Sequence, residues 1–298
     1  MRAFLWFLLL LAVALGVVAV FTYPAWLLLH PYFDFPFHRI GERIGMLALA
    51  AGFLLVARRL KLTDRTSLGY GAPRPLFVRE MLIGLALGAA TMLTVVAAMS
   101  ALGLLDWSSA AAMGTGALAR LFAASLASGL AVALIEETFV RGAMYTAIER
   151  ESGARAAVIL TSLLYAATHF FGKVRIAPED VTPWSGVTLL GQSLQAFAHF
   201  AGIADAFLAL TAVGVVLALV RQATGNIAAC LGLHAGWVWL MLVAHQLSAP
   251  RRDAPLGFLL SRFDGFVGWL VLGWAVLLAV PLWRFYAARA AGSSAQSS

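Results

Sequence analysis

Long uninterrupted runs of apolar residues constrain this chain more than any other feature of its sequence. The run from Ala3 to Leu29 contains no charged residue, and several later runs are nearly as long. A helix crosses the hydrocarbon core of a bilayer with roughly 20 consecutive apolar residues. Overall the chain is 62% hydrophobic and 12% charged, against about 25% charged residues in soluble domains. The sequence therefore predicts a membrane protein with several spans.

The spans are expected to be helices, because the runs lack the period-two alternation of a membrane barrel. We expect an all-α transmembrane bundle of about eight helices in one domain over residues 1–290, with a small polar tail at 291–298 that is predicted to be disordered. The first run is predicted to be a retained helix, since its apolar core is too long for a secretory signal. The predicted spans are 4–29, 41–57, 79–105, 117–148, 154–172, 203–221, 226–247 and 265–286.

The basic residues predict the orientation of the bundle. The densest basic loop lies between the second and third spans, and the positive-inside rule assigns it to the cytoplasm, with both termini on the same side. Arginines after the fourth, sixth and eighth spans agree, whereas three near residue 255 fall on the opposite side. The residues that agree are Arg58, Arg59, Lys61, Arg65, Arg74, Arg79, Arg150, Arg155, Arg221, Arg284 and Arg289; those that disagree are Arg251, Arg252 and Arg262. We expect a bacterial inner membrane protein.

Charge and cysteine content argue against two classes of function. The net charge of +7 comes from residues in short loops beside apolar runs, where they contact lipid headgroups, so no nucleic-acid partner is expected. Cys230 is the single cysteine and lies inside an apolar run, which predicts a small core residue. Neither a disulfide framework nor a thiolate metal cluster can form from it.

Two adjacent carboxylates and a guanidinium lie within the fourth predicted span. Glu136 and Glu137 are followed by Arg141 in an otherwise apolar run. Each charge costs at least about 2.5 kcal/mol at membrane depth, so such residues are rare unless paired or functional. Residues four apart share a helix face, which predicts an ion pair between Glu137 and Arg141. Glu136 points about 100° away and needs its own polar environment or a proton, which suits a general base. A structural network of all three charges is the alternative.

Two further predicted spans each place a histidine among apolar residues. Tyr165 and His169 lie one turn apart in the fifth span, and His234 lies in the seventh. A lone histidine in a membrane helix is more often a core residue with a partner than a ligand. Ionisable groups in a membrane bundle face its interior, however, so groups from three helices are expected to converge. The sequence thus predicts one polar cavity that contains Glu136, His169 and His234.

Together these residues resemble the CPBP (Abi-like) family of intramembrane proteases, which includes type II CAAX prenyl endopeptidases and bacteriocin-processing relatives. The resemblance covers residues 115–245 and rests on E-E-x-x-x-R, an aromatic-x-x-x-H and a later H-A. It implies that Glu136 and His169 activate the attacking water. It also implies that His234 binds the water or the developing oxyanion, and that Glu137 and Arg141 support the site. Peptide hydrolysis requires such a base and such donors.

The sequence departs from the family pattern at two positions. Tyr165 stands where the family usually has Phe, which keeps the ring and adds a hydroxyl. Val238 stands where the family usually has Asn, so the donor to the oxyanion is left open. Asn226 is a possible substitute, although its position at the start of a span favours helix capping. The indole N–H of Trp237 or Trp239 is another possible donor to the oxyanion.

Metal dependence stays open at this point. Glu136, His169 and His234 are a plausible ligand set for one divalent ion such as zinc. A carboxylate and an imidazole can also activate water without a metal, and contiguous H-E-x-x-H is absent.

The sequence predicts an intramembrane endopeptidase that hydrolyses a peptide bond in a membrane-anchored protein or peptide. The substrate could be a lipidated protein, a precursor peptide or a membrane-anchored tail. One alternative is a catalytically silent scaffold or immunity protein of the same fold. Another is a proton-coupled transporter, in which the same side chains would form a relay, although transporters often have paired repeats, which are not seen here.

Overall fold

The computed structural model describes residues 1–108, 113–171 and 175–295, and nearly all of them are helical. The long helices are α1 (Arg2–Leu29), α2 (Phe37–Arg59), α3 (Arg74–Ala101), α5 (Thr115–Glu137), α6 (Tyr145–Thr168), α7 (Ser185–Ala198), α8 (Ala204–Thr224), α9 (Ala228–Leu247) and α10 (Trp269–Ala295). A π-helix, η1 (Thr138–Met144), joins α5 to α6, and the short 3-10 helices are η2 (Pro178–Asp180), η3 (Phe200–Gly202) and η4 (Gly257–Leu259). Two short strands, β1 (Leu105–Asp106) and β2 (Ala249–Pro250), pair antiparallel, with Leu105 opposite Pro250.

The predicted all-α membrane bundle is confirmed. Seven helices within the described residues are long and apolar enough to cross a membrane, so the chain is an integral membrane protein. The fourth and fifth predicted spans together make one of these seven, the stretch Thr115–Thr168. This stretch consists of two helices that meet at a kink, because Gly153 has the non-helical angles φ 83° and ψ 166°. The two predicted spans are therefore separate helices that follow each other without a loop.

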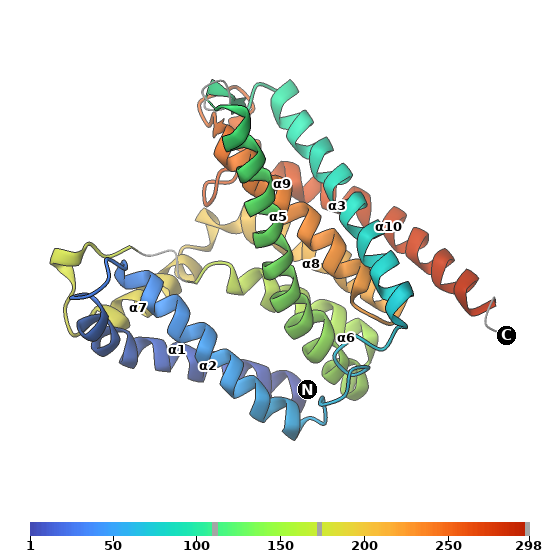
Figure 1. Cartoon of the computed structure of the whole chain (residues 1–298), viewed down its shortest axis with the longest axis horizontal. Coiled ribbons are helices and arrows are strands. Elements are labelled where there is room, and N and C mark those ends of the chain that lie inside the picture. Colours follow the sequence, from blue (N-terminus) through green and yellow to red (C-terminus); the bar gives the residue numbers. More distant parts are fainter. Residues whose placement is uncertain (109–112, 172–174, 296–298) are drawn as a thin grey trace.

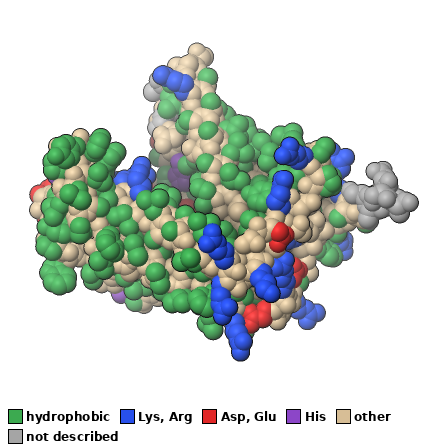
Figure 2. Space-filling model, turned by 60° about the horizontal axis from the view of Figure 1, so that its bottom comes forward, with side chains coloured by type: hydrophobic (Ala, Val, Ile, Leu, Met, Phe, Trp, Pro, Cys, Tyr) green, Lys and Arg blue, Asp and Glu red, His purple; other side chains and the backbone are tan. Residues whose placement is uncertain are grey.

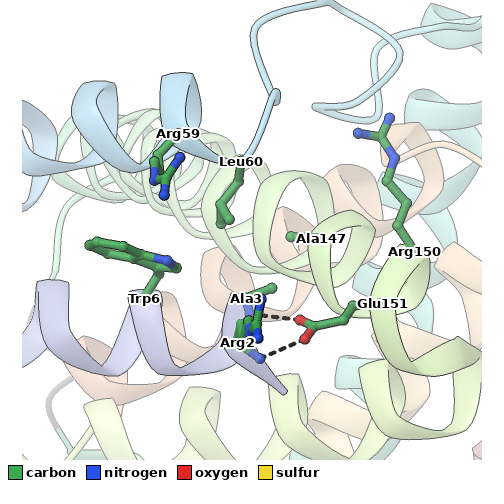
Figure 3. Close-up of a pocket in the computed structure, with 8 residues that line it drawn as sticks. All are labelled: Arg2, Ala3, Trp6, Arg59, Leu60, Ala147, Arg150 and Glu151. Carbon is green, nitrogen blue, oxygen red and sulfur yellow. Dashed lines mark hydrogen bonds between the residues drawn. The ribbon is translucent and has the colours of Figure 1, made fainter.

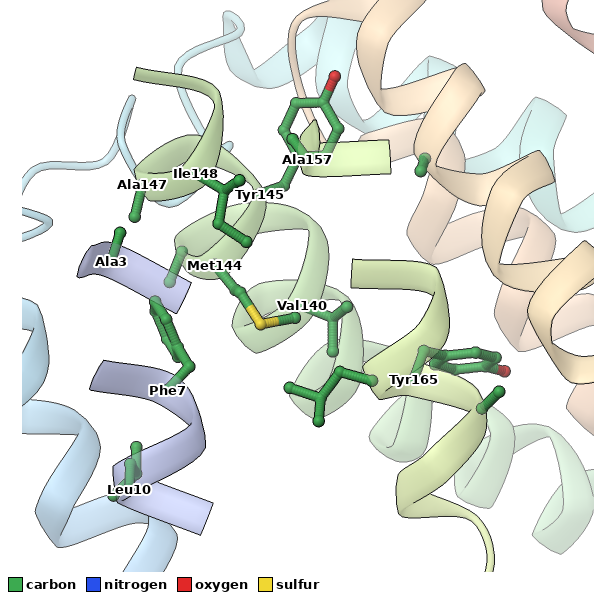
Figure 4. Packing of buried hydrophobic residues seen from close by; sticks show 14 of the residues in the cluster. Ala3, Phe7, Leu10, Val140, Met144, Tyr145, Ala147, Ile148, Ala157 and Tyr165 are labelled. Carbon is green, nitrogen blue, oxygen red and sulfur yellow. The ribbon is translucent and has the colours of Figure 1, made fainter. Parts of the chain in front are cut away.

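The helices form two groups that meet at η1 and α6 (Figure 1). In one group α1 and α2 pair with each other, and α7 packs against α1. In the other, α3 and α5 flank α9, and α8 contacts both α6 and α10. A hydrophobic cluster joins the groups: Phe7 and Leu10 of α1 lie near Met144 of η1 and Ile148 of α6 (Figure 4). Because η1 follows the two glutamates directly, this junction lies beside the predicted site.

The C-terminal helix extends further than its predicted span. The span was expected to end at 286, but α10 continues to Ala295, into the segment predicted to be a disordered tail. Its small residues include several alanines, and Ala is the strongest helix former. The last three residues, 296–298, lie outside the described residues, so the predicted tail stays a prediction there.

Glycines allow α3 and α9 to approach until their backbones touch. Gly84 and Gly88 lie one turn apart on α3, and Gly232 and Gly236 lie one turn apart on α9. A Cβ on Gly84 would lie 2.5 Å from the carbonyl oxygen of Ala229, and one on Gly236 would lie 2.7 Å from that of Leu85. Small residues spaced in this way are a common device for close helix packing in membranes.

A third glycine brings α5 against the opposite side of α9. A Cβ on Gly129 would lie 2.8 Å from the carbonyl oxygen of Ala235. The α9 helix is therefore held between α3 and α5, and its central residues are buried, including His234 and Cys230. The thiol of Cys230 donates to the carbonyl of Leu217 at 3.3 Å, which confirms that the single cysteine is a core residue.

Substituting Gly232 by valine is expected to destabilise the bundle by about 1 to 3 kcal/mol or more, the usual cost of overpacking. The added Cβ would overlap the carbonyl oxygen of Met81, a backbone atom that cannot move without separating α3 from α9. Gly273→Val is the matched control, because a Cβ there meets nothing within 4 Å. Thermal unfolding in detergent should show a lower unfolding temperature for Gly232→Val only. Equal losses in both variants would show that helix propensity, and not close packing, is responsible.

Candidate active site

A buried ion pair joins the end of α5 to η1. Arg141 Nη1 donates to Glu137 Oε1 at 3.1 Å, and both side chains have no exposed surface. Arg141 Nη2 donates to the carbonyl of Gly214 in α8 at 3.2 Å, and its guanidinium lies 4.4 Å from the centre of the Tyr165 ring. Charges buried this completely persist only when paired and hydrogen-bonded. The pairing predicted from the four-residue spacing is confirmed.

His234 of α9 lies between the two carboxylates of α5. Its Nδ1 is 2.9 Å from Glu137 Oε1, and its Nε2 is 3.9 Å from Glu136 Oε2. Because Nδ1 contacts Glu137, Nε2 is the ring nitrogen nearer to Glu136. The gap between Nε2 and Oε2 is too long for a direct hydrogen bond.

Glu136 differs from Glu137 in its surroundings, although the two are adjacent in sequence. Its side chain is 33% exposed, whereas that of Glu137 is fully buried. Glu136 Oε2 is itself buried and has no hydrogen-bond partner among the described residues. In Figure 2 a histidine side chain is visible inside a recess of the molecular surface. Of the two carboxylates, Glu136 is the one that a water or substrate can reach.

Tyr165 connects the second predicted histidine to the rest of the site. Its ring centre lies 4.6 Å from that of His169 and 5.9 Å from that of His234. His169 Nδ1 lies 2.8 Å from the carbonyl oxygen of Tyr165, which accepts its hydrogen bond and fixes the ring at the end of α6. The structure thus gathers all five predicted residues. Glu136, Glu137, Arg141 and His234 lie next to one another, and His169 adjoins them through the ring of Tyr165.

The π-helix η1 was not predicted from the sequence. It begins immediately after Glu137 and contains Arg141. Such π segments often occur at functional sites. Arg221 of α8 contacts this one, because its Nε donates to the carbonyl of Arg141 at 3.1 Å. Its Nη2 donates to Thr146 Oγ1 at 3.3 Å, and its guanidinium lies 5.3 Å from the Tyr145 ring.

Arg221 lies at the end of its helix as predicted, in the last turn of α8. Its surroundings differ from the expectation of a residue that faces lipid headgroups, because only 6% of its surface is exposed. Its guanidinium donates instead to the carbonyl of Arg141 and to Thr146 Oγ1.

Arg221→Gln is expected to lower kcat about tenfold with little change in KM, since a small displacement of Arg141 moves Glu137 and His234 away from their geometry. The pH dependence of kcat should shift as well, because the charges around His234 are rearranged. Thr146→Val is the control, as it removes one Arg221 contact and keeps the bond to the Arg141 carbonyl. Partial rescue by Arg221→Lys is expected. An unchanged pH profile in Arg221→Gln would limit the residue to a structural role.

The alternative donors considered from the sequence are engaged elsewhere. The indole of Trp237 donates to Thr91 Oγ1 at 3.0 Å, and that of Trp239 donates to the carbonyl of Phe122 at 3.0 Å. Both suggestions were wrong, because each indole joins α9 to a neighbouring helix. Asn226 Oδ1 accepts from the backbone N–H of Ala228 at 2.9 Å, which confirms its role at the start of α9.

The predicted metal ligands do not form a metal-binding set as they are arranged. Zinc requires three or four protein ligands around one point. Among the residues that the structure describes, no group of three or more His, Cys, Asp or Glu side chains lies close enough to hold an ion. His169 is separated from His234 by the ring of Tyr165.

Comparison with known proteins agrees with the site. Residues 118–240 match the family model described as type II CAAX prenyl endopeptidase, Rce1-like, which is about two fifths of the chain. No curated protein and no solved structure matches the chain. The matched segment contains all five predicted site residues and lies within residues 115–245. The resemblance drawn from the sequence motifs is thereby confirmed.

Proposed function

We propose that this integral membrane protein, whose residues 118–240 belong to the type II CAAX prenyl endopeptidase family, is an intramembrane endopeptidase. It hydrolyses a peptide bond in a membrane-anchored protein or peptide by means of a water held between Glu136 and His234. One observation carries the proposal: His234 lies between two carboxylates, of which one is neutralised by Arg141 and the other is not. This asymmetry leaves one accessible base beside an oriented imidazole.

Glu136 takes a proton from the water while the oxygen of that water attacks the carbonyl carbon of the scissile bond. The same carboxylic acid then returns the proton to the leaving nitrogen, so that one water is consumed and the residue is regenerated. His234 orients the water through Nε2, and Glu137 holds the ring through Nδ1. His169 adjoins this site from the other side of the Tyr165 ring.

The proposed substrate is membrane-anchored because the base lies within a helical stretch that is long and apolar enough to cross a membrane. Its anchor could be a lipidated C-terminus, a precursor segment or a membrane-spanning tail. The topology proposed with it places both termini in the cytoplasm of a bacterial inner membrane, by the positive-inside rule.

Purified protein in liposomes tests the proposal against its rivals. The assay presents one reporter peptide in three forms: prenylated at a C-terminal cysteine, fused to a membrane-spanning segment, and free in solution. Cleavage of an anchored form but not the free form is the expected result. A silent scaffold would cleave none of them, and a transporter would instead move protons across the liposome after a pH jump. Either outcome would overturn the assignment.

The rate of cleavage is expected to be unchanged after prolonged treatment with a metal chelator. The reason is the arrangement of the side chains, since the described residues hold no three-ligand set and the ring of Tyr165 separates His169 from His234. Stepwise addition of Zn²⁺ after chelation is the control. Activity that disappears with the chelator and returns with stoichiometric Zn²⁺ would contradict this expectation and favour a rearranged metal site.

A further inference from the structure

A second concave site lies at the basic end of the molecule, away from the glutamates. It is a cleft of about 450 Å³ between the start of α1, the end of α2 and the middle of the α5–α6 stretch (Figure 3). Its walls include Arg2, Trp6, Arg59, Leu60, Arg150 and Glu151. None of these residues takes part in the candidate active site.

Positive charge dominates this cleft. Arg2, Arg59 and Arg150 line it, and none of the three forms an ion pair with another described residue. Arg150 is anchored by neutral acceptors, since its Nη2 donates to Ser67 Oγ at 2.7 Å. Three guanidiniums without carboxylate partners at one cleft are suited to an anion with several oxygen atoms.

The one carboxylate among the described lining residues does not neutralise these arginines. Glu151 accepts the backbone N–H groups of Arg2 and Ala3, each at 2.7 Å (Figure 3). It therefore caps the N-terminal end of α1, where the helix dipole favours a negative charge. The same contacts fasten α1 to α6, two of the three sides of the cleft.

The cleft opens beside an apolar surface that faces lipid. Trp6 lines it and is 37% exposed, and Leu5 and Leu9 on the same helix are 58% and 52% exposed. Figure 2 shows Lys and Arg side chains gathered at one end of the molecule, next to a face on which hydrophobic side chains predominate. A ligand that fits both surfaces has an anionic head and apolar chains.

We propose that this cleft binds the phosphate group of an anionic membrane lipid, with its acyl chains along the exposed side of α1. Basic pockets between membrane helices at the cytoplasmic interface are suited to such headgroups. A phosphate held by Arg2 of α1, Arg59 of α2 and Arg150 of α6 would bridge the two helix groups of the fold. The lipid would thereby stabilise the junction on which η1 depends.

Lipid binding to the full-length protein in detergent tests this proposal by native mass spectrometry. Phosphatidylglycerol is the probe, and phosphatidylcholine, whose zwitterionic headgroup has no net charge, is the comparison. Arg59→Gln is expected to weaken phosphatidylglycerol binding about tenfold. Arg58→Gln is the matched control, because Arg58 is its exposed neighbour on α2 and does not line the cleft. Arg2→Gln is a second variant at an exposed residue and should act like Arg59→Gln.

Three results would overturn the proposal. Equal weakening in Arg58→Gln and Arg59→Gln would mean diffuse attraction to the basic end. Equal binding of both lipids to the unmodified protein would mean that the headgroup charge is not recognised. Complete displacement of the lipid by millimolar inorganic phosphate would mean a site for free anions. The measurement does not depend on peptidase activity, so its outcome is separate from that of the proposed function.

Discussion

Glu136→Gln is expected to lower kcat by at least about a hundredfold, the lower range of what a general base contributes. Glutamine has nearly the same shape but cannot accept the proton of the attacking water. The substitution removes no hydrogen bond between described residues, because Glu136 Oε2 has no partner among them. Unfolding temperature and KM should therefore stay close to those of the wild type. The measurement is steady-state cleavage of an anchored reporter in liposomes.

Glu179→Gln is the control for this prediction, since it makes the same chemical change at an exposed residue of η2. It should leave kcat unchanged. If Glu136→Gln retained activity within a few-fold of the wild type, another group would have to be the base.

Arg141→Met is expected to destabilise the protein by about 3 to 5 kcal/mol, the usual cost of removing one partner of a buried ion pair. The loss leaves Glu137 fully buried, with His234 as its remaining polar partner in the site. The bond to the Gly214 carbonyl is lost as well. Denaturant or thermal unfolding in detergent measures the effect, and activity should fall with the folded fraction.

The double variant Glu137→Gln with Arg141→Met separates stability from function. Removing both charges should recover most of the lost stability, because no uncompensated ion remains. Activity should not recover, because His234 has lost the carboxylate that holds its Nδ1. A double variant as active as the wild type would show that the Glu137–Arg141 pair has no role in positioning His234.

The sequence left open two readings of the charges on Glu136, Glu137 and Arg141. Glu137 and Arg141 form a structural charge pair with no exposed surface. Glu136 stays outside that pair and is partly exposed, and its role as the base is the proposal made above. Adjacent glutamates thus have different surroundings because helix geometry points them in different directions.

Much of this arrangement follows from rules that act locally. The length of each apolar run predicts a membrane helix, and a four-residue spacing predicts the pair of Glu137 and Arg141. The convergence of His234 on the glutamates follows from the cost of exposing ionisable groups to lipid. The glycines one turn apart in α3 and α9 are a further local signal, which indicates close packing of these two helices.

Other features depend on contacts between distant segments and had no local signal. The π-helix is supported by Arg221, 80 residues beyond the carbonyl that it binds. Trp237 and Trp239 carried suitable donors, but their direction depended on how α9 lies between α3 and α5. The kink at Gly153, where two helices meet without a loop, likewise required a backbone conformation that residue type alone permits but does not dictate.

Product analysis in ¹⁸O-labelled water tests most directly whether water between Glu136 and His234 cleaves a peptide bond. The wild type in liposomes should convert an anchored reporter into two complementary fragments, with one ¹⁸O atom in the new carboxyl group after a single turnover. Glu136→Gln, folded to the same extent, should yield neither fragment. Intact reporter with the wild type, or equal labelled product from both proteins, would contradict the account.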